Sequence, residues 1–220
     1  MVCQTVYHLV TMSILLKDVE GFSNDIYRIR RTILQMLSDR NYDIGDQLED
    51  DYETFKMNNY DILENKILSG LTINCTHKEN YDERVQVRFD KPYFIIREKE
   101  LYKELQQEKV NHFIFIVEEN RQTQKLINAF KAVKIKIEFF LFKEMMINIT
   151  HHNLVPKHEP LSMKEKEELL KCYHIKENQL PLISEHDPIC RYFGVEPGVV
   201  MRITRRSNTA GKYVIYRLVI

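Results

Sequence analysis

Histidine and cysteine side chains, the usual protein ligands of zinc, gather in the last third of the chain. They are His151, His152, His158, Cys172, His174, His186 and Cys190. A zinc site needs closely spaced ligand pairs such as Cys-x-x-Cys or His-x-x-x-His, and neither occurs here. The adjacent His151 and His152 would point to opposite faces of a strand. We therefore expect packing and hydrogen-bonding roles for these residues, and no metal site.

Acidic residues next to lysine would suggest a metal-dependent nuclease of the restriction-enzyme type. Such enzymes hold Mg²⁺ with Asp and Glu, and place a Lys two positions from the Glu on a strand. The triplet Glu64-Asn65-Lys66 has that spacing, but the apolar pairs around it repeat five residues apart, which suits a helix. The six glycines form no phosphate-binding loop, and no Gly-x-Ser-x-Gly occurs. We predict no catalytic residues and no cofactor.

Two basic patches remain as candidates for binding. Residues 121–143 hold six Lys or Arg against one acid, Glu138, with Arg121 and Lys125 on one face of an expected helix. That face is either solvated or a contact to phosphates. The second patch follows Glu196, after which no acidic residue occurs. Its cations lie among tyrosines, so nucleic acid and an acidic protein partner are both open.

The first 147 residues predict alternating helices and strands, which is typical of a mixed α/β layer. Helices are expected at 24–39, 98–109 and 121–131, and strands at 71–76, 85–89, 112–117, 134–140 and 145–149. Ser23 or Asn24 would cap the first helix. The stretch 39–64 holds nine acidic residues and is expected to be a solvated surface.

The last third changes character and is rich in proline. Ser162 and Glu165 form a capping box that opens a helix ending near residue 173. Asp187-Pro188 starts a short helix that Gly194 closes. Pro197-Gly198 suits a type II turn. Strands at 199–205 and 213–220 then predict a two-stranded ribbon.

The composition is that of an ordinary folded protein. Of 220 residues 44% are hydrophobic, and Lys+Arg and Asp+Glu both number 32, so no overall positive charge holds nucleic acid. The four cysteines are far apart, which favours a reducing compartment. The mildly apolar stretch 6–16 is too short to span a bilayer, and we expect no membrane association.

Residues 148–220 carry many motifs in a fixed order. They include Asn148-Ile-Thr-His-His-Asn-Leu-Val-Pro-Lys-His158, Gln179-Leu-Pro181, Asp187-Pro188, Arg191-Tyr192, Gly194, Arg206-Ser207, Thr209-Ala-Gly211 and Tyr216-Arg217. This pattern resembles the assembly domain of the fifth subunit of eukaryotic nuclear RNA polymerases, a family whose archaeal members consist of this domain alone. The preceding residues resemble the eukaryotic jaw domain of that family, with an opening helix and a His-Phe-Ile-Phe-Ile-Val strand followed by Glu-Glu-Asn.

The resemblance implies an α+β protein. An N-terminal extension (1–23) would precede a mixed α/β jaw domain (24–147) with a restriction-endonuclease-like fold, and a small α+β assembly domain (148–220) would end in the two-stranded ribbon. It also implies a non-catalytic structural subunit of DNA-directed RNA polymerase in the nucleus. The assembly domain would dock on the largest subunit, and the jaw domain would lie beside downstream double-stranded DNA, bound weakly and without sequence preference.

Two sets of site residues follow from the resemblance. Arg121 and Lys125 are the DNA-proximal candidates; they stand where the family carries a Thr-Pro-Ser-Ala-like loop, whose proline this chain lacks. The candidates for docking on the partner are Leu154, Pro156, His158, Tyr192, Gly194, Arg206, Tyr216 and Arg217. The alternative is a free-standing DNA-binding or nuclease-like module, which the balanced charge and the missing carboxylate pair disfavour.

Overall fold

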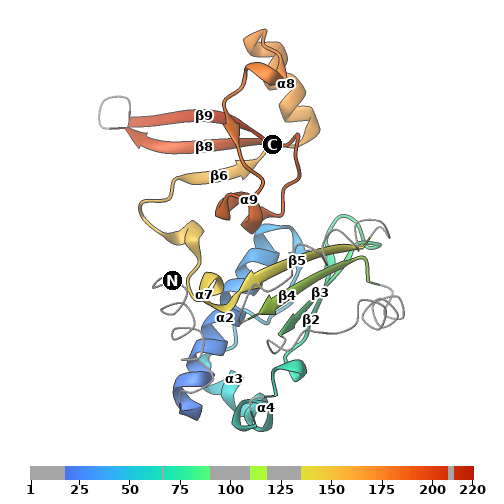
Figure 1. The fold of residues 1–220 in the computed structure, drawn as a ribbon, viewed down its shortest axis with the longest axis vertical. Helices are drawn as coiled ribbons and strands as arrows, with labels where there is room; N and C mark the ends of the chain where they lie inside the picture. The colour runs from blue at the N-terminus through green and yellow to red at the C-terminus, as the bar shows by residue number, and fades with distance from the viewer. Residues whose placement is uncertain (1–17, 66, 90–109, 118–134, 208–210) are drawn as a thin grey trace, which may run out of the picture. The chain divides into compact units, whose positions relative to one another are not determined.

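The computed structural model describes residues 18–65, 67–89, 110–117, 135–207 and 211–220. The chain divides into two compact units, 1–147 and 148–220, each described below by itself (Figure 1). The helices expected at 98–109 and 121–131 lie outside the described residues. No helix in the described ranges has the length and apolar character needed to cross a membrane.

The first helix, α2 (Val19–Asp39), begins five residues earlier than the sequence predicted. Asp18 is the N-cap, and its carboxylate accepts a hydrogen bond from the Gly21 N–H at 3.0 Å. Ser23 is no cap, because its hydroxyl donates to the Val19 carbonyl at 2.6 Å. Phe22 is fully buried, so residues 19–23 belong to the folded unit and the extension predicted at 1–23 was too long.

The acidic stretch that follows α2 folds into short elements. They are β1 (Tyr42–Asp43), α3 (Tyr52–Asn58), α4 (Tyr60–Glu64) and the 3₁₀ turn η1 (Leu68–Gly70). Asp51 caps α3 by accepting from the Thr54 N–H at 2.8 Å. Phe55 and Leu63 are buried, while most of the charged side chains stay exposed. The predicted solvated surface is therefore anchored by a few apolar residues.

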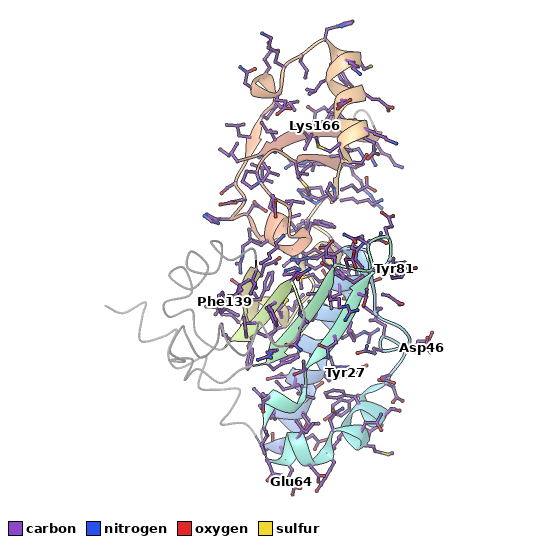
Figure 2. All side chains as sticks on the ribbon, turned by 90° about the vertical axis from the view of Figure 1, so that its right-hand side faces the viewer. Tyr27, Asp46, Glu64, Tyr81, Phe139 and Lys166 are labelled. Atoms are coloured by element: carbon purple, nitrogen blue, oxygen red, sulfur yellow. The ribbon has the colours of Figure 1, made fainter. Side chains whose placement is uncertain are left out.

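Five strands form the sheet of the first unit in the order β1-β2-β3-β4-β5. The later four are β2 (Ile73–His77), β3 (Arg84–Phe89), β4 (His112–Val117) and β5 (Lys136–Leu141). β1, β2 and β3 pair antiparallel, whereas β3, β4 and β5 are parallel. All six residues of β4 are buried, as expected for a central parallel strand. Figures 1 and 2 show α2 crossing one face of this sheet.

The strand predicted at 145–149 is absent. The chain forms the short helix α7 (Phe142–Met145) and then the 3₁₀ turn η2 (Ile149–His151). The Glu144 carboxylate accepts from the Leu141 N–H at 3.0 Å and closes a helical turn directly after β5. Asn148 starts η2 by accepting from the Thr150 N–H at 2.9 Å. Local side-chain caps therefore override the apolar run that suggested a strand.

The second unit is a four-stranded mixed sheet with two helices. Its strands lie in the order β6-β8-β9-β7. Along the chain the elements are β6 (Lys157–Pro160), α8 (Met163–Tyr173), η3 (Glu177–Gln179), β7 (Leu182–Ile183), α9 (Pro188–Phe193), β8 (Val200–Ser207) and β9 (Gly211–Val219). The predicted two-stranded ribbon is thus the middle of a larger sheet. Because β6 and β7 have only four and two residues, neither shows a strand pattern in the sequence.

The turn and cap predictions for this unit are confirmed. Ser162 and Glu165 form the reciprocal capping box of α8. Asp187 caps α9 through the Ile189 N–H at 2.9 Å, and Gly194 ends it with a φ of 62°. Gly198 has a φ of 96°, and the Val199 N–H donates to the Glu196 carbonyl at 3.2 Å, as a type II turn requires.

Candidate docking surface

The inner half of the β8–β9 ribbon is covered on both faces. On one face Met201, Ile203 and Val219 pack with Ile189 and Cys190 of α9. The other face carries residues that alternate with these: Val200, Tyr216 and Leu218 pack with Leu169 and Leu180. Side chains of a strand point alternately to the two faces, so one strand pair serves both clusters. This half of the ribbon is the core of the unit.

The outer half of the ribbon is exposed and positively charged. Arg206 pairs with Lys212 and Arg205 with Tyr213 across the two strands. All four side chains are exposed, Tyr213 to 54%. No acidic residue occurs between Val200 and Val219. Because the opposed Arg206 and Lys212 repel each other, an anionic group bound there would relieve an unfavourable contact.

Lys166 fixes α8 to the turn that precedes the ribbon. Its ammonium donates to the Gly198 carbonyl at 2.8 Å and lies 2.9 Å from a carboxylate oxygen of Glu177. The side chain is only 9% exposed, so the charge is almost removed from water and needs both partners. Figure 2 labels Lys166 on this helix. The contact fixes the helix that covers Tyr216.

One of the predicted docking residues, Tyr192, is internal, which is a correction, and a second, Gly194, is half-buried. Tyr192 is 1% exposed, and its hydroxyl accepts a hydrogen bond from the Asn148 side-chain amide at 3.1 Å. Gly194 supplies the left-handed residue at the end of α9 and has no side chain. Neither can offer a side chain to a partner. Both residues shape α9, since Tyr192 packs inside the unit and Gly194 ends the helix.

Three predicted residues precede or form β6. Leu154 is 86% exposed, a large apolar side chain in a turn. Pro156 and His158 are half-buried, and His158 Nδ1 donates to the Pro156 carbonyl at 2.7 Å. Burial lowers the pKa of His158, although this hydrogen bond acts in the opposite direction. Leu154 is therefore the accessible group of the three.

The remaining three lie on β8 and β9. Arg206 is exposed, whereas Tyr216 is half-buried with its ring centroid 6.3 Å from that of Tyr173. Arg217 is also half-buried, on the same face as Met201. Its Nε atom is buried and has no hydrogen-bond partner among the described residues. The structure thus brings Arg206, Tyr216 and Arg217 onto one ribbon. The DNA-proximal candidates Arg121 and Lys125 lie outside the described residues.

A buried charged network in the first unit was not found from the sequence. The Arg40 guanidinium donates to both carboxylate oxygens of Glu138, at 3.1 and 2.8 Å. His112 Nε2 lies 2.8 Å from Glu138 Oε1, and His112 Nδ1 lies 3.3 Å from the Tyr42 hydroxyl. That hydroxyl donates to Glu83 at 2.9 Å. The available signal was Glu138 itself, the one acid in the basic stretch 121–143 and the middle of an apolar strand.

This network joins the end of α2 to three strands, β1, β4 and β5. Burial opposes ionisation of Glu138, but the charge of Arg40 and the hydrogen bond from His112 outweigh it and hold the pKa of the carboxyl well below its usual range. Burial and the hydrogen bond to Glu83 raise the pKa of Tyr42. The polar groups of this network hydrogen-bond to one another, so the network holds α2 and the three strands together. In the described ranges no three His, Cys, Asp or Glu side chains are grouped so as to hold a metal.

These observations define a class: a two-unit α+β protein whose second unit carries exposed cations at the end of its β8–β9 ribbon. Comparison with known protein families identifies this class more closely. The model of the RNA polymerase Rpb5 C-terminal domain matches residues 147–219, and that of the Rpb5 N-terminal domain matches residues 22–101.

Curated relatives agree over nearly the whole chain. The Caenorhabditis elegans protein named DNA-directed RNA polymerases I, II, and III subunit RPABC1 is 38% identical over 201 residues, 89% of this chain and 95% of that protein. Its Dictyostelium discoideum namesake is 38% identical over 202 residues, 89% and 97% of the two chains. An Arabidopsis thaliana protein, DNA-directed RNA polymerases IV and V subunit 5B, is 32% identical over 196 residues, 88% of each chain.

The chain belongs to the Rpb5 family of RNA polymerase subunits. The resemblance read from residues 148–220 is thereby confirmed, and it extends to the first unit. Members of this family are non-catalytic components of RNA polymerase, so the nuclease-like alternative is not supported.

Proposed function

We propose that this chain is a structural subunit of a nuclear DNA-directed RNA polymerase. The second unit docks on the largest subunit, and the first unit lies beside downstream double-stranded DNA and contacts it weakly. The observation that carries the proposal is the cationic end of the β8–β9 ribbon within the span that matches the Rpb5 C-terminal domain. Arg205, Arg206 and Lys212 stand there without an acidic neighbour on either strand. Such a surface suits an acidic face of a larger protein.

The first unit supports the second half of the proposal. Its parallel β3–β4–β5 core, with an antiparallel β2, is compatible with a restriction-endonuclease-like fold. We propose that fold for the jaw, used as a scaffold beside DNA and not for cleavage. The free thiols Cys75, Cys172 and Cys190 suit a reducing compartment such as the nucleus.

The docking surface is tested by reversing one exposed charge. Arg206→Glu should lower recovery of the largest subunit with an affinity-tagged chain by roughly three- to tenfold, since it replaces attraction with repulsion at a partly solvated contact. Lys164→Glu is the matched control, because Lys164 is an exposed cation of the same unit on α8. It should assemble like the wild type. Equal recovery with both variants would show that the ribbon end is not the docking surface.

Tyr216→Ala is a less direct test of the same surface. Tyr216 packs with the cluster beneath α8, so its loss opens that cluster as well as any contact with a partner. We expect weaker assembly together with a lower melting temperature. Arg206 has no such core role, and its variant should melt no lower than the wild type, because Glu opposite Lys212 replaces a like-charge pair with an attractive one.

A further inference from the structure

The outer edge of β9 is an open strand edge. β9 pairs with β8 along residues 211–218, but it pairs with β7 only at Leu218 and Val219. Along residues 211–217 no strand in the described part of the chain lies on that side. Figure 1 shows α8 near the C-terminal end of β9, while the other end of the ribbon projects beyond it. Seven residues of strand span about 23 Å.

The backbone direction along this edge follows from two hydrogen bonds at its inner end. The Leu218 N–H donates outward to the Pro181 carbonyl at 2.8 Å, and the Val219 N–H donates inward to the Val199 carbonyl at 2.9 Å. Backbone groups alternate between the two sides of an antiparallel strand. The N–H and C=O groups of Tyr216, Val214 and Lys212 therefore point to the open edge. They offer three donors and three acceptors.

The side chains around this edge indicate what would bind there. Lys212 lies on β9 itself, and Arg205 and Arg206 lie one strand inward on β8; all three are exposed, and the ribbon from Val200 to Val219 contains no acidic residue. Tyr213 and Val214 are 54% and 41% exposed, so apolar surface lies between the charges. A phosphate backbone offers only acceptors and would leave the outward carbonyls unpaired. An extended peptide supplies donors and acceptors alternately, and acidic side chains would meet the cations.

We propose that residues 211–217 of β9 take an extended, acidic segment of another polymerase subunit as an added strand of the second unit's sheet. This proposal rests on the function proposed above, because it specifies how the docking unit binds its partner. Backbone hydrogen bonds set the register of the added strand against β9, and the basic side chains favour an acidic sequence in that strand.

Val214 allows the backbone to be tested apart from the side chain. Its N–H points to the open edge and takes no part in pairing with β8, so Val214→Pro removes one outward donor and leaves the ladder intact. The proline ring also blocks the incoming strand. Recovery of polymerase on a tagged full-length chain should fall about tenfold, the effect of roughly 1.4 kcal/mol. Val214→Ala keeps the donor and should stay within about twofold of the wild type. Equal recovery with Val214→Pro, at an unchanged melting temperature, would overturn the proposal.

Residue-resolved hydrogen exchange gives a second measurement that needs no variant. In the assembled polymerase the amides of Lys212, Val214 and Tyr216 should exchange at least tenfold more slowly than in the free chain. The amides of Tyr213 and Ile215, which already face β8, should change much less. Unchanged exchange at the three outward amides in an intact complex would refute strand addition and leave the proposed function standing.

Two further outcomes separate the alternatives. If the tagged chain recovers no polymerase at all, the proposed function and this inference both fail. The other outcome is that a 20-base-pair DNA duplex alone slows hydrogen exchange at the three outward amides while assembly does not. In that case the edge binds nucleic acid, and an acidic peptide is ruled out as its ligand. The duplex is expected to leave these amides unchanged, since its phosphates cannot pair with the outward carbonyls.

Discussion

Glu138 shows how a single buried charge can define the interior of the first unit. Its carboxylate lies between Arg40 and His112, and the Arg40 side chain is only 4% exposed. A bidentate guanidinium–carboxylate pair is among the stronger polar contacts in proteins. Yet taking both ions out of water costs about as much free energy as their attraction returns. The pair therefore matters mainly because loss of either partner would leave the other charge buried and unpaired. The network therefore specifies one arrangement of α2 against β4 and β5.

Removal of Arg40 should be severe for that reason. Arg40→Ala leaves Glu138 ionised and buried with only His112 at 2.8 Å and the half-exposed Lys136 at 3.8 Å, and should lower the free energy of unfolding by about 3–5 kcal/mol. The double variant Arg40→Ala with Glu138→Gln removes the uncompensated charge and should recover part of this loss. Urea unfolding of the full chain measures both. If the double variant were no more stable than Arg40→Ala alone, the pair would not be coupled as described.

The same pair predicts a dependence on pH. The folded pKa of Glu138 lies below the ordinary value of 4.5, so its contribution is fully present above 4.5 and is lost as the pH falls from there through the folded pKa. Stability of the wild type should therefore fall between about pH 5 and pH 3 by up to about 1.4 kcal/mol per pH unit from this group. Glu138→Gln should flatten this part of the curve. An identical slope in both proteins would contradict the assignment.

At the scale of elements, the second unit depends on a few contacts between helix and sheet. Lys166 joins α8 to Gly198 and Glu177, and Leu169 on the same helix packs against Val200. Lys166→Ala leaves the Gly198 carbonyl without its donor and should destabilise the chain by about 1–3 kcal/mol. Lys164→Ala, an exposed neighbour on the same helix, should change stability by less than about 0.5 kcal/mol. Thermal unfolding of the two variants tests this, and equal melting temperatures would exclude a structural role for Lys166.

Elements defined by local signals were predictable from the sequence. α8 and α9 follow from caps within three residues of the helix start, and β4 follows from five consecutive apolar residues, Phe113–Val117. The start of α2 was missed because Asp18 and Ser23 both suit an N-cap, and only the burial of Phe22 decides between them. β7 was missed because two residues acquire strand geometry only by pairing with β9. The Arg40–Glu138 pair joins residues 98 positions apart, and no spacing rule reaches that far.

The docking candidates likewise could be predicted only in part from the sequence. The resemblance pointed to residues on the β8–β9 ribbon, but a motif does not separate residues that could touch a partner from those that shape the unit. Tyr192 is buried and Gly194 ends α9, so both have a role inside the unit. The open edge of β9 depends on which strands pair with it, so it became visible only with the sheet order.

At the scale of the whole molecule, the balanced charge implies that any hold on DNA comes from local cations within a larger assembly. Arg121→Glu with Lys125→Glu should leave assembly intact. The affinity for downstream DNA should also depend less steeply on salt. Two lost phosphate contacts reduce the magnitude of the slope of log affinity against log salt concentration by about 1.8. Lys78→Glu with Arg84→Glu, two cations of the same unit outside this patch, is the control with equal charge change. An unchanged slope in the first variant would remove Arg121 and Lys125 from the DNA-proximal surface.

The central claim is that this chain acts as a docked part of an RNA polymerase and performs no reaction of its own. Native mass spectrometry of the complex purified through an affinity tag on the full chain tests it most directly. We expect one copy of the chain in a particle that contains the largest polymerase subunit, and we expect the free chain released by mild dissociation to leave DNA uncut. A spectrum that shows only the free chain, or a free chain that cleaves DNA with Mg²⁺, would contradict the claim.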